Sequence, residues 1–195
     1  MKYYLIALFL VVASQLYAQA WTQDQLSKAN TAADIEYLSQ VEKDVILYIN
    51  LARLYPKQFA RQEVNNYYGP KKYGGYLKDS PYRASLLKKL LTMQALKALR
   101  FDEKMYKSAK CFAIESGEAG KTGHKRTTCP EENVAECCSY GMSTGKDVVL
   151  QLLIDHGVPS LGHRKICLDP SYTKVGAGEY AHKAHETCTV VNMIW

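Results

Sequence analysis

The spacing of apolar residues changes along this chain of 195 residues, and the change constrains the fold more than any other feature. Several segments before Gly157 repeat apolar residues every three or four positions, as one face of an α-helix does. Beyond Pro170, residues 174–180 and 186–195 have the composition of strands, and a weaker strand is expected at 132–140. Helices followed by strands predict an α+β fold, with helices stacked on a small sheet.

Helix starts are marked by residues that can bind free backbone N–H groups. Ser39 and Glu42 form a capping box, and Asp102 is a plausible N-cap. Thr144 with Asp147 gives the third start. The corresponding helices should cover about 41–55 with a continuation to 59, about 102–117, and 144–157, and a leucine-rich segment lies at 85–100.

The first twenty residues predict export. Lys2 gives a positive start, residues 3–13 form an apolar run too short to span a bilayer with its flanks, and small residues follow. We expect cleavage after Ala20, or after Ala18 as the close competitor, with an uncleaved anchor as the alternative. The signal peptide then covers 1–20, an N-terminal extension covers 21–38, and one domain covers 39–195. The mature chain should be secreted to the extracellular space or periplasm, and we do not expect it to be an integral membrane protein.

Six cysteines lie beyond the signal segment, and their even number suggests disulfide bonds in an oxidising compartment. The pairing stays open, because sequence alone does not choose among the possible combinations. Cys137 and Cys138 are adjacent, so in a strand they point to opposite faces and must have different partners. Buried unpaired thiols are the alternative.

The net charge of +6 is concentrated in residues 53–100, where Glu63 and Asp79 are the only acidic residues among many lysines and arginines. Within this segment, residues 67–76 interleave tyrosines with lysines, which is compatible with stacking on bases or sugars. A solvated loop rich in glycine explains the composition equally well, and no nucleic-acid-binding motif accompanies it. We therefore expect no nucleic-acid partner.

Short motifs follow one another in a set order: Asn50-Leu51-Ala52-Arg53, Gly123-His124, Glu132-Asn133-Val134-Ala135, Gly162-His163-Arg164 and Val175-Gly176-Ala177-Gly178. In this order the chain resembles the CAP superfamily of cysteine-rich secretory, antigen and pathogenesis-related proteins, known in bacteria as SCP-like extracellular domains. Each motif is weak alone, and their order and spacing make the resemblance more specific. It covers about residues 42–195.

The resemblance implies a three-layer α-β-α sandwich with a small, mainly antiparallel central sheet and a cleft lined by two histidines and two acidic residues. Its histidines correspond to His124 and His163, and its first glutamate to Glu132, preceded by Glu131 where the family usually has glycine. The second glutamate has no match, and either Asp147 or Asp155 is the substitute. The expected cleft residues are His124, Glu132, Asn133, Asp155, His163 and Arg164.

Two imidazoles and a carboxylate suit zinc or another divalent metal, with an open position for water. His124 and His163 are therefore the candidate metal ligands, and a hydrogen-bonded polar cluster that fixes the cleft walls is the alternative. With Glu132, they are also the candidates for catalysis. Arg164 is expected to pair with a carboxylate or a helix C-terminus.

The remaining histidines have no match in the family pattern. His156 lies at the end of a predicted helix, where a cationic imidazole is favoured as a cap. His182 and His185 flank Lys183 in a predicted hairpin turn and should be exposed.

Residues 141–145 indicate a different class, because they match the Gly-x-Ser-x-Gly elbow of serine hydrolases. Ser143 would be the nucleophile of a triad that takes its other members from Asp155 or Asp169 and from His182 or His185. Few strands precede Ser143, however, and the predicted helix cap already explains the segment.

Together these features predict a secreted module that binds an extracellular protein, lipid or glycan in a cleft lined by histidine and glutamate, with a divalent metal such as zinc as its candidate cofactor. The alternative is a secreted hydrolase that uses either a metal at His124 and His163 or the Ser143 nucleophile.

Overall fold

The computed structural model describes residues 20–195, so the predicted signal peptide lies outside the described part except for its last residue. The helices are α1 (Gln23–Ala29), α2 (Gln40–Leu54), α3 (Pro56–Phe59), α4 (Pro81–Thr92), α5 (Glu103–Ala119), α6 (Gly145–Ile154) and α7 (Gly162–Cys167). Two short helices of other types are η1 (Ala60–Val64) and η2 (Lys71–Tyr73). The strands are β1 (Arg100–Phe101), β2 (Ala135–Tyr140), β3 (Lys174–His182) and β4 (Glu186–Ile194). Within these residues, no helix has the length and apolar character needed to span a bilayer.

The four strands form one sheet in the order β1-β3-β4-β2. β3 and β4 are antiparallel and their register pairs Lys174 with Ile194. β2 is antiparallel to β4, whereas β1 is parallel to β3. The prediction of a small, mainly antiparallel sheet is therefore confirmed, and β2 is an edge strand.

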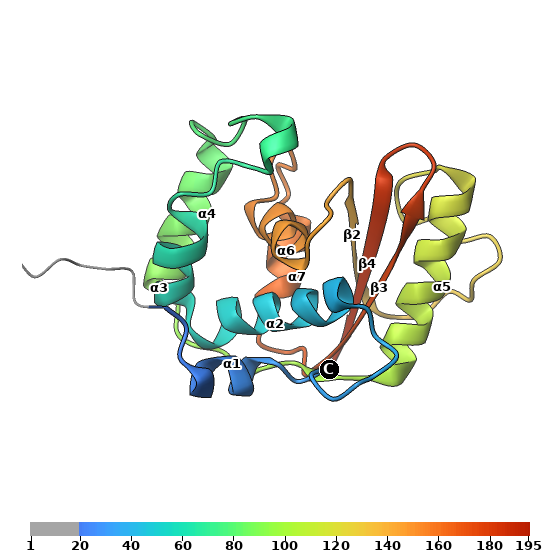
Figure 1. Ribbon diagram of the computed structural model, residues 1–195, viewed down its shortest axis with the longest axis horizontal. Coiled ribbons are helices and arrows are strands. Elements are labelled where there is room, and N and C mark those ends of the chain that lie inside the picture. Colours follow the sequence, from blue (N-terminus) through green and yellow to red (C-terminus); the bar gives the residue numbers. More distant parts are fainter. Residues whose placement is uncertain (1–19) are drawn as a thin grey trace, which may run out of the picture.

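Helices cover both faces of the sheet (Figure 1). α5 lies along one face over β3 and β4, while α2, α6 and α7 lie on the other. Glycines in β3 allow α5 to approach closely: a Cβ atom on Gly176 would collide with the backbone of Tyr106, and one on Gly178 with the backbone of Lys110. The α+β class and the three layers are as predicted.

The predicted helix caps are confirmed. The side chains of Ser39, Asp102 and Thr144 each accept a hydrogen bond from a backbone N–H of the first turn, and Ser39 completes its capping box with Glu42. α6 ends at Ile154, three residues before the predicted stop, because Asp155 adopts the left-handed conformation and caps it.

The Asn-x-x-Arg motif of α2 is structural. Asn50 donates to the carbonyl of Leu99 and accepts from its N–H. Arg53 is fully buried and donates to four carbonyl oxygens, those of Lys97, Cys167, Asp169 and Tyr172. These bonds hold Lys97 and Leu99, which belong to no helix; the helix of the leucine-rich segment begins at Pro81, capped by Ser80, and ends at Thr92.

One disulfide bond, Cys111–Cys129, ties α5 to the loop that follows it. The other four cysteines, Cys137, Cys138, Cys167 and Cys188, are buried and unpaired in the structure. Cys137 belongs to the core beneath α2 and α6, and Cys138 to the core beneath α5. The two adjacent cysteines therefore face opposite sides of β2, as their spacing predicts.

His182 departs from the predicted exposure, because it is buried at the end of β3. Its Nε2 atom lies 3.2 Å from the carbonyl oxygen of Lys121, and its ring packs against that of Tyr140. The loop after α5 thus covers the hairpin on this side. His185 is exposed, as expected.

Residues 21–38, predicted as an extension, pack against the domain. α1 contacts α2, and a capping box between Thr22 and Gln25 fixes its start. The indole N–H of Trp21 donates to the carboxylate of Glu63 over 2.7 Å. This segment therefore contributes to the same fold.

Candidate functional site

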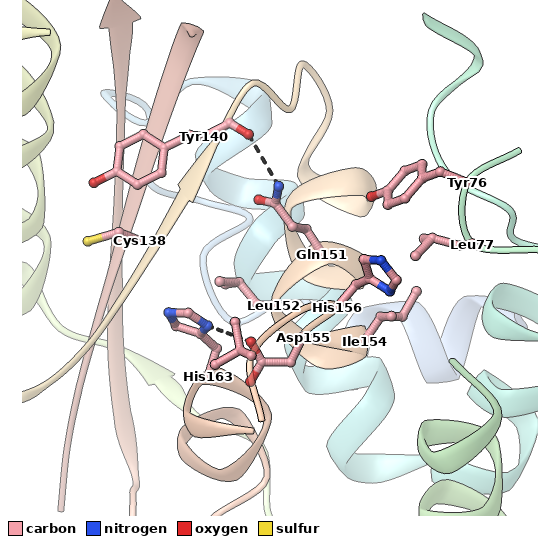
Figure 2. Close-up of a pocket in the computed structure, with 11 residues that line it drawn as sticks. Tyr76, Leu77, Cys138, Tyr140, Gln151, Leu152, Ile154, Asp155, His156 and His163 are labelled. Atoms are coloured by element: carbon pink, nitrogen blue, oxygen red, sulfur yellow. Dashed lines mark hydrogen bonds and ion pairs between the residues drawn. The ribbon is translucent and has the colours of Figure 1, made fainter. Parts of the chain in front are cut away.

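A cavity of about 330 Å³ lies between Cys138 and Tyr140 of β2, the end of α6, the start of α7 and the tyrosine-rich loop, residues 67–76 with the adjoining Leu77 (Figure 2). Polar groups on its walls come from Tyr76, Tyr140, Gln151, Asp155, His156 and His163. Apolar walls come from Leu77, Leu152, Ile154 and Val158. We refer to this space as the His163 cavity.

A histidine–aspartate pair stands at one side of the His163 cavity. Nδ1 of His163 lies 2.7 Å from Oδ1 of Asp155. The Asp155 side chain is 1% exposed, and its other oxygen accepts the backbone N–H of Arg164 over 3.3 Å. Since Asp155 is fixed by its left-handed cap position, it holds the imidazole in one orientation. Nε2 of His163 has no hydrogen-bond partner among the described residues, so this atom can meet a ligand.

Arg164 points away from the cavity, although it follows His163 directly. Its guanidinium donates to the carbonyls of Leu153 and Ile154 at the end of α6, and to Tyr82 and Ser85 of α4. Burial lowers the pKa of Arg164, and the negative charge of Asp155 opposes that effect. Arg164 thus binds a helix C-terminus, which is one of its two expected roles, and supports the His163 cavity from behind.

The tyrosine-rich loop is held over the cavity by His156. Nδ1 of His156 lies 2.9 Å from Oγ of Ser80, and its ring packs edge-to-face against Tyr76 and Tyr82. Asp155, and not His156, takes the cap position of α6, so the prediction of a capping histidine was wrong. The basic, tyrosine-rich segment is therefore an ordered wall of a cavity.

A second pocket, of about 340 Å³, lies on the other side of β2 and contains His124. Nδ1 of His124 is 3.0 Å from Oε1 of Glu136, and this hydrogen bond raises the pKa of His124. Arg126 binds the other carboxylate oxygen of Glu136, and its guanidinium stacks on the ring of Phe112. Cys138 Sγ lies 3.7 Å from Nδ1 of His124. We refer to this space as the His124 pocket.

Glu132 and Asn133, the remaining candidates, lie near the His124 pocket without bonding its histidine. Glu132 lines the pocket and forms an ion pair with Lys104 over 3.1 Å. Asn133 is exposed. Asp147, the other candidate for the second acidic residue, accepts hydrogen bonds from Tyr67 and Thr144. Asp155 is therefore the acidic residue that the structure places beside a cleft histidine.

The two candidate histidines line different pockets, one on each side of the edge strand β2. Figure 2 shows the sulfur of Cys138 directed away from the ring of His163. Sequence reasoning missed Glu136, which lies outside the family motifs. Its signal was the two-residue spacing between Glu136 and Cys138 in a predicted strand, which places both side chains on one face.

Ser143, the alternative nucleophile, is exposed in the turn between β2 and α6. The hydrogen bonds of the described residues include none between its side chain and a histidine. Thr144 caps α6 through the N–H of Asp147, as predicted. The geometry that a nucleophile elbow requires, a hydroxyl bound to a base, is not formed here.

These features define a class of protein: an α-β-α sandwich whose cleft carries a histidine held by a buried carboxylate. The model of the CAP, or cysteine-rich secretory protein, family matches residues 48–193, and the chain belongs to this family. Among solved structures, an outer surface protein from Borrelia burgdorferi is similar, with 23% identity, a TM-score of 0.41, and coverage of 56% of this chain and 84% of that chain. A search of curated proteins found no match.

Proposed function

We propose that this CAP-family protein is exported and acts outside the cell as a binding module, with the His163 cavity as the site that receives its ligand or partner. Family membership supports an extracellular role, and the predicted signal peptide supports export. The observation that carries the proposal is the fixed His163–Asp155 pair beside a concave space with both polar and apolar walls.

The walls of the cavity indicate what it accepts. Leu77, Leu152 and Ile154 are apolar and buried, so they suit an apolar body. His163 offers one fixed polar atom, and Tyr76, 42% exposed at the rim, offers an aromatic surface. A ligand with an apolar body and one polar end matches this arrangement. Extracellular lipids, glycans and protein segments all contain such groups.

Binding to glycan and lipid arrays, followed by affinity measurement for each hit, tests the proposal. His163→Ala and Tyr76→Ala should each weaken binding by roughly 30-fold, the effect of losing about 2 kcal/mol at a binding hot spot. Tyr180→Ala is the matched control, since Tyr180 is an exposed tyrosine of β3 that does not line the cavity.

Asp155→Asn refines the test. Asparagine tolerates the left-handed backbone of this position, so the fold should persist while the charge that orients His163 is lost. Weaker binding by Asp155→Asn, with unchanged thermal stability, would support the role of the pair. If ligands bound the His163→Ala and Tyr76→Ala variants as tightly as the unmodified protein, the cavity would not be the binding site.

A further inference from the structure

We propose that His124, Glu136 and Cys138 form a binding site for a divalent cation of the zinc type, separate from the His163 cavity. This proposal does not rest on the proposed function: of its three residues only Cys138 also lines the His163 cavity, and its sulfur lies beside His124. It also differs from the metal site expected from sequence, in which His163 was the second ligand.

Three side chains from two segments meet at this site. Glu136 and Cys138 alternate on β2, so both face the side of the sheet covered by α5. His124 comes from the loop after α5 and is 55% exposed. Among the described residues, these three are the one group of histidine, cysteine and acidic side chains whose ligand atoms lie close enough to share an ion.

The distances between the ligand atoms are close to those around a tetrahedral zinc ion. Nδ1 of His124 lies 3.0 Å from Oε1 of Glu136, and Sγ of Cys138 lies 3.7 Å from that nitrogen and 3.9 Å from that oxygen. Ordinary zinc–ligand bond lengths place tetrahedral neighbours about 3.3–3.6 Å apart. Shifts of a few tenths of an ångström would therefore bring all three atoms into coordination.

The donor set selects the kind of cation. One nitrogen, one oxygen and one sulfur form a borderline-soft set, which zinc and similar transition metals prefer over calcium or magnesium. The three protein ligands leave the fourth tetrahedral position for water, which can enter through the His124 pocket. Arg126 holds the second oxygen of Glu136 and so orients this ligand from the outer shell.

Metal coordination would also change the state of the Cys138 thiol. Without a cation, the buried Cys138 thiol donates weakly to the carbonyl of Gly123 over 3.5 Å. On binding, the Cys138 thiol would release its proton to solvent and its sulfur would bind the metal as thiolate, while the proton shared by Nδ1 of His124 and Oε1 of Glu136 would leave these atoms and free both for the metal. The negative charges of thiolate and carboxylate would then balance the charge of the ion.

Cobalt(II) gives a readout specific to this site, because a thiolate ligand produces an intense sulfur-to-cobalt charge-transfer absorption. Full-length mature protein, purified and titrated without reductant under argon so that the Cys111–Cys129 bond stays intact and the thiols are not oxidised, should bind cobalt or zinc in equimolar amount by calorimetry and show this absorption with cobalt. Cys138→Ser should abolish the absorption. His124→Ala should weaken binding by more than the roughly 10- to 100-fold that loss of an outer-shell partner costs.

Cys188→Ala is the matched control, since Cys188 is another buried cysteine on the same face but is not a ligand. It should leave affinity and absorption unchanged, and circular dichroism should show that every variant is folded. Because His124 is largely exposed, its variant keeps the test valid even if Cys138→Ser unfolds. Absent binding, a cobalt complex without sulfur absorption, or binding lost in His163→Ala but retained in Cys138→Ser would each overturn the proposal.

Discussion

Replacement of Arg53 by methionine tests the view that this buried guanidinium organises the segments around α7. Arg53 is fully buried, and its four carbonyl partners include Cys167, the last residue of α7, and two residues of the turn that follows. Methionine fills a similar volume but donates no hydrogen bond. Four carbonyl oxygens, one in a buried hydrogen bond and three in partly buried ones, would then lose their donor.

The size of the expected loss in free energy of unfolding follows from these hydrogen bonds. Hydrogen bonds to a charged group contribute about 1.5–3 kcal/mol each, whereas methionine avoids the several kcal/mol that burial of the guanidinium costs. The balance predicts that Arg53→Met lowers the free energy of unfolding by about 3–5 kcal/mol. For a domain of this size, that corresponds to a fall in Tm of roughly 10 °C.

Arg83 provides a matched comparison, because it also donates to four carbonyl oxygens, those of Val64, Asn65, Leu77 and Lys78. It is only half-buried, so water can replace its bonds, and Arg83→Met should cost about 1 kcal/mol or less. Urea denaturation followed by circular dichroism, with the disulfide bond intact, measures both variants. Equal losses for the two, or a loss below about 1 kcal/mol for Arg53→Met, would refute the reasoning.

Two further predictions concern α5. Burial alone would raise the pKa of Glu115, but hydrogen bonds donated by residues 127–129 lower it to about 2. Because the pKa of Glu115 is depressed in the folded protein, Glu115→Gln should destabilise the protein above pH 4.5, the ordinary pKa of the group. In urea titrations, this difference in stability from the unmodified protein should vanish as pH falls to about 2. A difference that is independent of pH would contradict the prediction. Gly178→Ala should cost about 1–3 kcal/mol by pushing α5 from β3, whereas Gly75→Ala, with open space around it, should be neutral in the same assay.

Local signals account for what the sequence could predict about the fold. A helix cap depends on residues about three positions apart, so Ser39, Asp102 and Thr144 could be assigned without knowledge of the tertiary structure. The order of helices and strands was likewise sufficient for the α+β class. The motif glycines Gly176 and Gly178 proved to be the positions where α5 meets β3.

The features that the sequence could not predict depend on contacts between distant segments of the chain. Glu136 bonds His124 because the loop after α5 returns to β2, and no spacing in the sequence encodes that return. His182 is buried for a related reason, since Lys121 and Tyr140 cover it. The sequence analysis placed His124 and His163 in one cleft, whereas in the structure they line different pockets.

The position of β2 has a consequence for how this protein can change by mutation. β2 is paired along one edge, and its alternate residues serve different sides, with Cys137 near the backbone of His163 and Cys138 near His124. Insertion or deletion of one residue would exchange the two sets of side chains and disturb both pockets at once. Substitutions in the tyrosine-rich loop or in the loop after α5 would alter one pocket and spare the other. Descendants of this chain can therefore diversify each pocket through its own loop, provided that the strand between them keeps its length.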